Sequence, residues 1–272
     1  CNPDGTQQVI YDERSPKYVD HLNKTFYFLE DGRCFIVREE TSTGYMHLYL
    51  YGIGQGVLHP ITQGEWEVTD FVGLRGDKVY YISTESSPLK RDLYRVGLDG
   101  KHKERLTPGD GYYSIYPSAD LSYYICEGGD SSAPGRTDVF NAAGKRVRTL
   151  YDNAPLKEAL VEAGLPVREF FTFTTERGDE LNGYMLKPLD FDPAKRYPVL
   201  LTQYSGPGSQ QVAEGWGPDW EDALVTHGYI VVCVDPRGTG YRGEEFKKLT
   251  YGNLGRLEVE DQISTARYMA RQ

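Results

Sequence analysis

The sequence predicts two parts: about three blades of an incomplete β-propeller, followed by the first part of a mixed α/β domain. Residues 34–51 and 79–96 are copies of one segment at an offset of 45 positions. A repeat of about 45 residues, built from short strands and turns, is typical of a four-stranded propeller blade. After residue 153, strand-like and helix-like segments alternate instead, which favours a mostly parallel sheet covered by helices.

The repeat extends over residues 1–153. Each copy carries a glycine turn of the hairpin type, followed by a basic residue and β-forming residues. A partial first blade is expected to end at residues 4–11, so the array is expected to begin in mid-blade. The aligned segments are 34–40 (CFIVREE) with 79–85 (VYYISTE), 47–51 (HLYLY) with 92–96 (DLYRV), and 122–125 (SYYI) as the start of a third copy.

Tyrosine is abundant in the repeated strands, with 22 in the chain. Between neighbouring sheets an aromatic ring fills space while its hydroxyl reaches a polar partner. We therefore assign most of these tyrosines to packing between blades.

The second part, residues 154–272, begins with an expected helix at 154–163. Pro155 lies in its first turn, and Gly164 is expected to end it. The further strands and helices are predicted as follows: strands at 169–175, 181–187, 197–204 and 229–235, and helices at 220–227 and 257–271.

Composition excludes several classes of function. The net charge of −10 argues against nucleic acid and anionic membranes as partners. No apolar run is long enough for a membrane-spanning segment. Neither a disulfide framework nor a zinc site is expected, because the cysteines are scattered, at positions Cys1, Cys34, Cys126 and Cys233. No other metal and no cofactor is expected.

The loop after the third α/β strand, residues 203–210 (QYSGPGSQ), is the first candidate site. Ligands bind at the carboxyl ends of strands in α/β sheets. A tyrosine at such a strand end, here Tyr204, can direct its hydroxyl at a developing oxyanion. The alternative is a turn whose glycines and proline only reverse the chain.

Residues 238–243 (GTGYRG) contain a literal G-x-G-x-x-G after a strand. A dinucleotide site is disfavoured, because that motif should open the first βαβ unit and two or three strands precede it here. Two acidic clusters, Glu39–Glu40 and Glu258 with Glu260 and Asp261, are interpreted as solvated structural groups.

A nucleophile–base pair is not evident. No G-x-S-x-G motif occurs, and none of the five histidines lies in a convincing catalytic setting.

Several motifs, in order along nearly the whole chain, resemble the prolyl oligopeptidase family of serine peptidases, and within it the dipeptidyl peptidase IV-like branch. The resemblance implies propeller blades followed by an α/β-hydrolase domain, and it replaces the dinucleotide interpretation. The motifs are residues 44–51 (GYMHLYLY), 61–68 (ITQGEWEV), 112–114 (YYS), 197–201 (YPVLL), 204–207 (YSGP) with 209–210 (SQ), 235–241 (DPRGTGY), and 254–255 (LG) with 258–262 (EVEDQ).

That resemblance implies a Ser-His-Asp exopeptidase that releases X-Pro or X-Ala dipeptides from peptide N-termini. Of the family's functional residues, only the oxyanion-hole tyrosine transfers, onto Tyr204. The serine, aspartate and histidine would follow residue 272, and the family's double glutamate would precede Cys1, since Glu39–Glu40 lies in the wrong blade. The chain is thus expected to be an internal fragment, truncated before the nucleophile and inactive alone.

Further expectations concern partners. Residues 164–272 would leave an apolar sheet edge open, so the remainder of the same polypeptide is the expected partner and the chain alone is expected to be poorly soluble. Members of the family are often dimers acting outside the cytoplasm, which makes a homodimer and a periplasmic or secreted location the corresponding expectations. The alternative function is a non-catalytic propeller-hydrolase protein that binds peptides or proteins.

Overall fold

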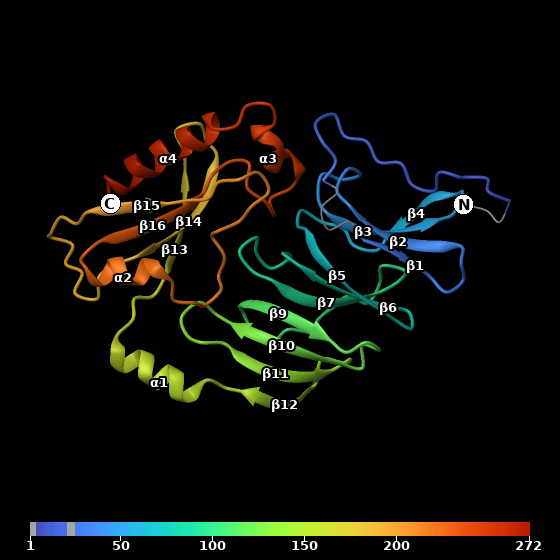
Figure 1. Cartoon of the computed structure of the whole chain (residues 1–272), viewed down its shortest axis with the longest axis horizontal. Helices are drawn as coiled ribbons and strands as arrows, with labels where there is room; N and C mark the ends of the chain where they lie inside the picture. Colours follow the sequence, from blue (N-terminus) through green and yellow to red (C-terminus); the bar gives the residue numbers. More distant parts are fainter. Residues whose placement is uncertain (1–3, 21–24) are drawn as a thin grey trace.

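Three antiparallel sheets of four strands each follow one another in the computed structural model, which describes residues 4–20 and 25–272 (Figure 1). Within each sheet the strands are ordered as they occur in the chain. This is the arrangement of propeller blades, and it confirms the fold expected from the repeat. The strands are β1 (Phe26–Phe28), β2 (Cys34–Glu39), β3 (His47–Gly52) and β4 (Gly56–Pro60); β5 (Val68–Arg75), β6 (Lys78–Ser83), β7 (Asp92–Gly97) and β8 (Glu104–Arg105); and β9 (Tyr112–Pro117), β10 (Tyr123–Gly129), β11 (Arg136–Asn141) and β12 (Arg146–Tyr151).

Neighbouring sheets bury their facing side chains. Residues of β2 and β3 form one core with residues of β6 and β7, and the opposite face of β6 and β7 packs on β9 to β11. Tyrosines contribute to both cores: Tyr81 stacks on Tyr94, and the Tyr80 hydroxyl donates to the carbonyl of Ala142 in the next sheet, at 3.0 Å. The assignment of the repeated tyrosines to packing between blades is therefore confirmed for these positions.

The expected partial first blade is absent, because residues 4–20 contain no strand. Val9 is 79% exposed and takes no part in the cores of the sheets. Instead the Tyr11 ring packs edge-on against Phe26 and Tyr51, at centroid distances of 5.2 and 5.4 Å. The segment is attached to the first sheet by side chains rather than by a strand ladder.

A fourth sheet forms the second part of the chain, after helix α1 (Ala154–Ala163). Its strand order is β13-β14-β16-β15, with β15 and β16 parallel. Aromatic and aliphatic residues of α4 pack on one face and α2 packs on the other. The elements are β13 (Glu169–Thr174), β14 (Glu180–Leu186), β15 (Val199–Thr202), α2 (Trp220–Thr226), β16 (Ile230–Asp235), α3 (Glu244–Lys247), the 3₁₀ turn η1 (Lys248–Thr250) and α4 (Arg256–Met269).

Two details differ from the sequence prediction. The strand expected at 197–204 ends at Thr202, the last residue paired with β16, because the chain turns at Ser205, whose φ is +60°. A short helix, α3, also follows Gly243, at a position outside the three helices predicted from the sequence.

The loops after β15 and β16 and helix α3 face the propeller sheets (Figure 1). The backbone N–H of Gly243 donates to the Glu67 carboxylate, and that of Glu244 donates to the carbonyl of Gly44 at 2.6 Å. Within the described part of the chain, no helix has both the length and the apolar character needed to cross a membrane.

Candidate functional site

Tyr204 lies two residues beyond β15 and is 71% exposed. The turn that presents it is local: Ser205 adopts a left-handed conformation, and its hydroxyl donates to the Gln203 side chain at 2.5 Å. The Tyr204 ring lies over Gly206, where an added Cβ would be 2.5 Å from a ring carbon. The absence of a side chain at Gly206 therefore permits the present orientation of the ring.

The rest of this loop, residues 203–212 (hereafter the Tyr204 loop), is fixed to the segment after β16. The Gly208 N–H donates to the Gly238 carbonyl and the Gly240 N–H donates to the Ser209 carbonyl, both at 2.8 Å. A Cβ at Gly240 would lie 2.6 Å from the Gly208 oxygen, so glycine is required where the two loops cross. This crossing accounts for one glycine of the G-x-G-x-x-G pattern without a nucleotide.

The end of the Tyr204 loop is held by Asp235, the last residue of β16. Its carboxylate accepts hydrogen bonds from the backbone N–H groups of Gln211 and Val212, at 3.0 and 2.8 Å. Burial raises the pKa of Asp235, and these two hydrogen bonds oppose the rise. Because β15 and β16 are parallel, both loops emerge from the same edge of the sheet, the edge where α/β sheets bind ligands.

Propeller residues hold the same loop from the opposite side. The Arg91 guanidinium donates to the Gln210 side-chain oxygen at 2.6 Å, and the Gln210 amide donates to the Pro88 carbonyl at 2.8 Å. The sequence offered no sign of these contacts, because more than a hundred positions separate the partners. A polar cavity of about 190 Å³ lies between this loop and the propeller sheets; its lining includes Arg38, Glu67, Pro207, Gly208, Tyr241 and Lys247.

The interpretation of Glu39–Glu40 as a solvated pair is wrong, since each residue is 1% exposed. The Glu39 carboxylate accepts hydrogen bonds from Thr41 and Ser42. The Glu40 carboxylate forms ion pairs with Lys247 and Lys248, at 2.5 and 2.9 Å. The sequence could not show this burial, because it results from tertiary packing: α3 and η1 place both lysines at the end of β2.

The second acidic cluster is also mostly buried. Asp261 is fully buried and accepts hydrogen bonds from the side chain and backbone N–H of Arg237, at 2.7 and 2.8 Å. Glu258 accepts from the Gly255 N–H at 2.9 Å and caps α4. Only Glu260 keeps a partly solvated carboxylate, 30% exposed, near Arg237. The solvated interpretation is thus wrong for Glu258 and Asp261, although their role is structural.

Among residues 4–20 and 25–272, no serine or cysteine side chain contacts a histidine ring through a hydrogen bond. His47 is buried and bonds Thr62 and the Gly64 carbonyl, and burial lowers its pKa. His227 bonds the Ala223 carbonyl at the end of α2. No group of three or more potential metal ligands occurs in this described part.

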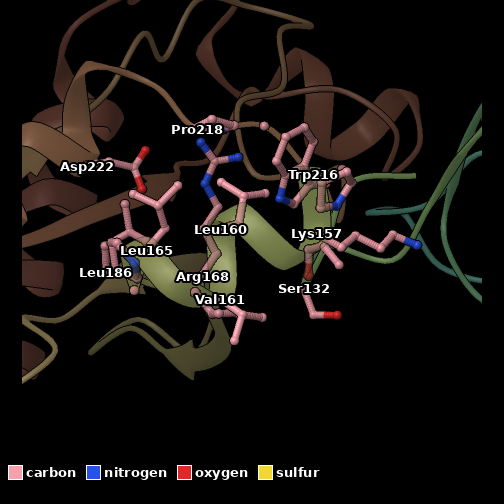
Figure 2. A pocket seen from close by; sticks show the side chains of 18 residues that line it. Ser132, Lys157, Leu160, Val161, Leu165, Arg168, Leu186, Trp216, Pro218 and Asp222 are labelled. Carbon is pink, nitrogen blue, oxygen red and sulfur yellow. The ribbon is translucent and has the colours of Figure 1, made fainter. Parts of the chain in front are cut away.

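A separate pocket of about 270 Å³ lies beside α1 (Figure 2). Leu160 of α1, Trp216 and Arg168 lie together on one side of the helix in the close view and line the pocket. Tyr204 is not part of its lining, and the pocket lies on the α1 side of the fourth sheet. It is therefore a feature distinct from the Tyr204 loop.

Comparisons with known proteins agree with this architecture. The family model described as "Dipeptidyl peptidase IV (DPP IV) N-terminal region" matches residues 2–134, and that described as "Prolyl oligopeptidase family" matches residues 216–272. A probable dipeptidyl peptidase 4 of Emericella nidulans is 37% identical over 84% of this chain, and a probable dipeptidyl-aminopeptidase B of Aspergillus niger is 39% identical over 82%.

Solved structures give the same result. The crystal structure of Porphyromonas gingivalis dipeptidyl peptidase 4 aligns with a TM-score of 0.86 and 39% identity over 93% of this chain and 36% of that chain. The two fungal relatives are covered over 31% and 26% of their lengths, so the chain spans between a quarter and a third of the length of these relatives. The chain belongs to the prolyl oligopeptidase family, in its dipeptidyl peptidase IV-like branch.

Proposed function

We propose that this chain contributes the last propeller blades (residues 1–153) and the first part of the α/β-hydrolase domain (residues 154–272) of a serine-type dipeptidyl peptidase. The substrate class is a peptide with a free N-terminus, from which an X-Pro or X-Ala dipeptide is released. The observation that carries the proposal is the exposed Tyr204 side chain, presented by a loop fixed on both sides at the ligand-binding edge of the sheet.

In this proposal Tyr204 is an oxyanion-hole residue. Attack of a serine on the scissile carbonyl places negative charge on the carbonyl oxygen, and the phenolic O–H donates a hydrogen bond to it. A donor that is already fixed in place needs no reorganisation during the reaction, which is why such groups stabilise a transition state strongly. The anchored loop holds in place the backbone that carries Tyr204.

The nucleophile, the base and the acid of the triad are assigned to polypeptide outside residues 1–272. Residues 1–272 expressed as a separate chain are accordingly expected to leave a Gly-Pro-4-nitroanilide substrate intact. Hydrolysis is expected from a polypeptide that carries these residues together with a Gly-x-Ser-x-Gly segment.

The test is Tyr204→Phe in that active polypeptide. Removing one oxyanion donor is expected to lower kcat by about 10²- to 10³-fold with little change in KM, because the lost hydrogen bond forms mainly in the transition state. Tyr123→Phe is the matched control, since Tyr123 is an exposed tyrosine of β10 in the third propeller sheet and should leave kcat unchanged. An unaltered kcat in Tyr204→Phe would refute the assigned role.

A further inference from the structure

Arg91 lies at the junction of three units of the fold. It directly precedes β7 in the second propeller sheet and is 5% exposed. Its carbonyl accepts a hydrogen bond from the Tyr113 N–H of β9, at 3.1 Å, which ties it to the third sheet. Its side chain extends toward the two loops at the carboxyl edge of the fourth sheet.

The guanidinium contacts both of these loops. One of its nitrogens donates to the Gln210 side-chain oxygen of the Tyr204 loop at 2.6 Å, and the group stacks on the ring of Tyr241, 3.9 Å from its centroid. The ring of Tyr112 lies on it as well, at 5.3 Å. Stacking on aromatic faces and a planar set of donors are properties of arginine that lysine does not share.

The second terminal nitrogen, Nη1, donates to the carbonyls of Pro88 and Lys90, at 3.2 and 2.7 Å. Within the described residues Arg91 forms no ion pair with a carboxylate. A buried cation without a counterion is costly unless its donors are used fully. The Arg91 guanidinium instead contacts carbonyls, aromatic faces and one amide, and each of these contacts restricts its position.

Gln210 connects the fixed Arg91 guanidinium to the turn that carries Tyr204. Its amide oxygen accepts from Arg91 while its amide nitrogen donates to the Pro88 carbonyl, so a flip of the amide would break both bonds. The preceding residue, Ser209, donates its backbone N–H to the Gly206 carbonyl at 3.0 Å. Gly206 is the residue on which the Tyr204 ring rests.

We propose that Arg91 is a positioning residue for catalysis: through Gln210 it fixes the Tyr204 loop to the propeller and so sets the place of the Tyr204 hydroxyl. This inference rests on the proposed oxyanion role of Tyr204. The propeller then supports the transition state indirectly, through one side chain that holds the Tyr204 loop in place.

The test uses Arg91→Met and Gln210→Met in the active polypeptide. Each variant removes one partner of the hydrogen bond between Arg91 and Gln210. Because Gln210 is partly exposed, Gln210→Met still provides the test if Arg91→Met does not fold. Arg95→Met is the matched control, because Arg95 lies on the same strand region and is bonded to Glu104 and to the Ala142 carbonyl, away from the loop.

The first readout, amide hydrogen exchange of residues 203–212, does not depend on activity. Loss of the charge-assisted hydrogen bond is expected to raise exchange in this segment about tenfold in both variants and to leave it unchanged in the control. The second readout is steady-state kinetics: kcat should fall about tenfold with KM unchanged, and the double variant should lose no more than either single variant.

Exchange that stays at the wild-type level in both variants would overturn the inference. So would faster exchange with an unchanged kcat, provided that Tyr204→Phe does lower kcat. If Tyr204→Phe has no effect, the oxyanion role fails on its own, and the exchange data still decide whether Arg91 fixes the loop.

Discussion

Single residues decide how Tyr204 is presented. The ring is exposed and lies over Gly206. Its orientation, and with it that of the hydroxyl, is possible only because Gly206 has no Cβ. Because the ring is at the surface, it can rotate away from an added methyl group at little cost in stability. A substitution at Gly206 should therefore displace the Tyr204 hydroxyl without destabilising the fold.

We expect Gly206→Ala to lower kcat of the active polypeptide by about 10²-fold, since the ring must leave its position and the oxyanion donor goes with it. The free energy of unfolding should change by less than about 1 kcal/mol. In the double variant with Tyr204→Phe the alanine should cause no further loss, because the hydroxyl is already gone. The measurements are steady-state kinetics and urea denaturation.

Gly217→Ala is the matched control, since a Cβ at Gly217 meets no atom within 4 Å. It should leave both kcat and stability unchanged. If Gly206→Ala kept the wild-type kcat, the ring would not need the orientation that the structure gives it.

At the scale of elements, strand β6 illustrates how the propeller sheets are joined. Tyr80 and Tyr81 are adjacent in this strand, so their rings point to opposite faces of the sheet and enter different cores. The Tyr80 hydroxyl donates to the Ala142 carbonyl of the third sheet, at 3.0 Å. The buried Tyr81 hydroxyl has no hydrogen-bond partner among residues 4–20 and 25–272.

The two tyrosines should therefore respond differently to the same change. Tyr80→Phe is expected to lower the free energy of unfolding by about 1 kcal/mol, because it breaks a hydrogen bond and leaves the Ala142 carbonyl without this donor. Tyr81→Phe is expected to be neutral or stabilising, because it removes an unsatisfied buried hydroxyl. Urea denaturation of both variants tests the pair, each serving as control for the other. Equal destabilisation would contradict the assignment of the hydroxyls.

The elements were largely predictable from sequence, because strand alternation, turn glycines and the 45-residue offset are local signals. The failures have physical causes. Residues 4–11 carry turn and β-forming residues but lie outside the sheets, and β15 ends early because Ser205 turns the chain. The role of Tyr204 is proposed from its motif, whereas no sequence signal pointed to Arg91, because its contacts with Gln210 and Tyr241 depend on how separate units dock.

At the scale of the whole molecule, a buried ionic cluster joins the first propeller sheet to the second part of the chain. Glu40 pairs with Lys247 and Lys248, and Lys247 also pairs with Asp20 at 3.0 Å. Burial, the largest single effect, would lower the pKa of Lys247, but the hydrogen bonds and charges of Glu40 and Asp20 together outweigh it and the pKa is raised. The cluster therefore stabilises the docked arrangement only while both signs of charge are present.

The raised pKa of Lys247 determines how stability depends on pH. A lysine whose pKa is higher in the folded state than in the unfolded state stabilises the fold. This contribution is fully present below the pKa of the unfolded state, about 10.4, and is lost as the pH rises through the pKa of the folded state. At neutral pH the whole contribution is present. Removing the partner carboxylate should therefore have its full effect at pH 7 and a smaller effect above about pH 10.4.

Glu40→Gln should lower the free energy of unfolding at pH 7 by about 3 kcal/mol, because it leaves buried lysine charge without its main counterion. Glu104→Gln, the same substitution in an exposed pair with Arg95, should cost less than about 1 kcal/mol. Urea denaturation at pH 7 and near pH 11 measures both variants against the wild type. A loss in Glu40→Gln no larger than that in Glu104→Gln would mean that the lysines find other partners. A loss that did not shrink at the higher pH would mean that Glu40 acts by packing and not by charge.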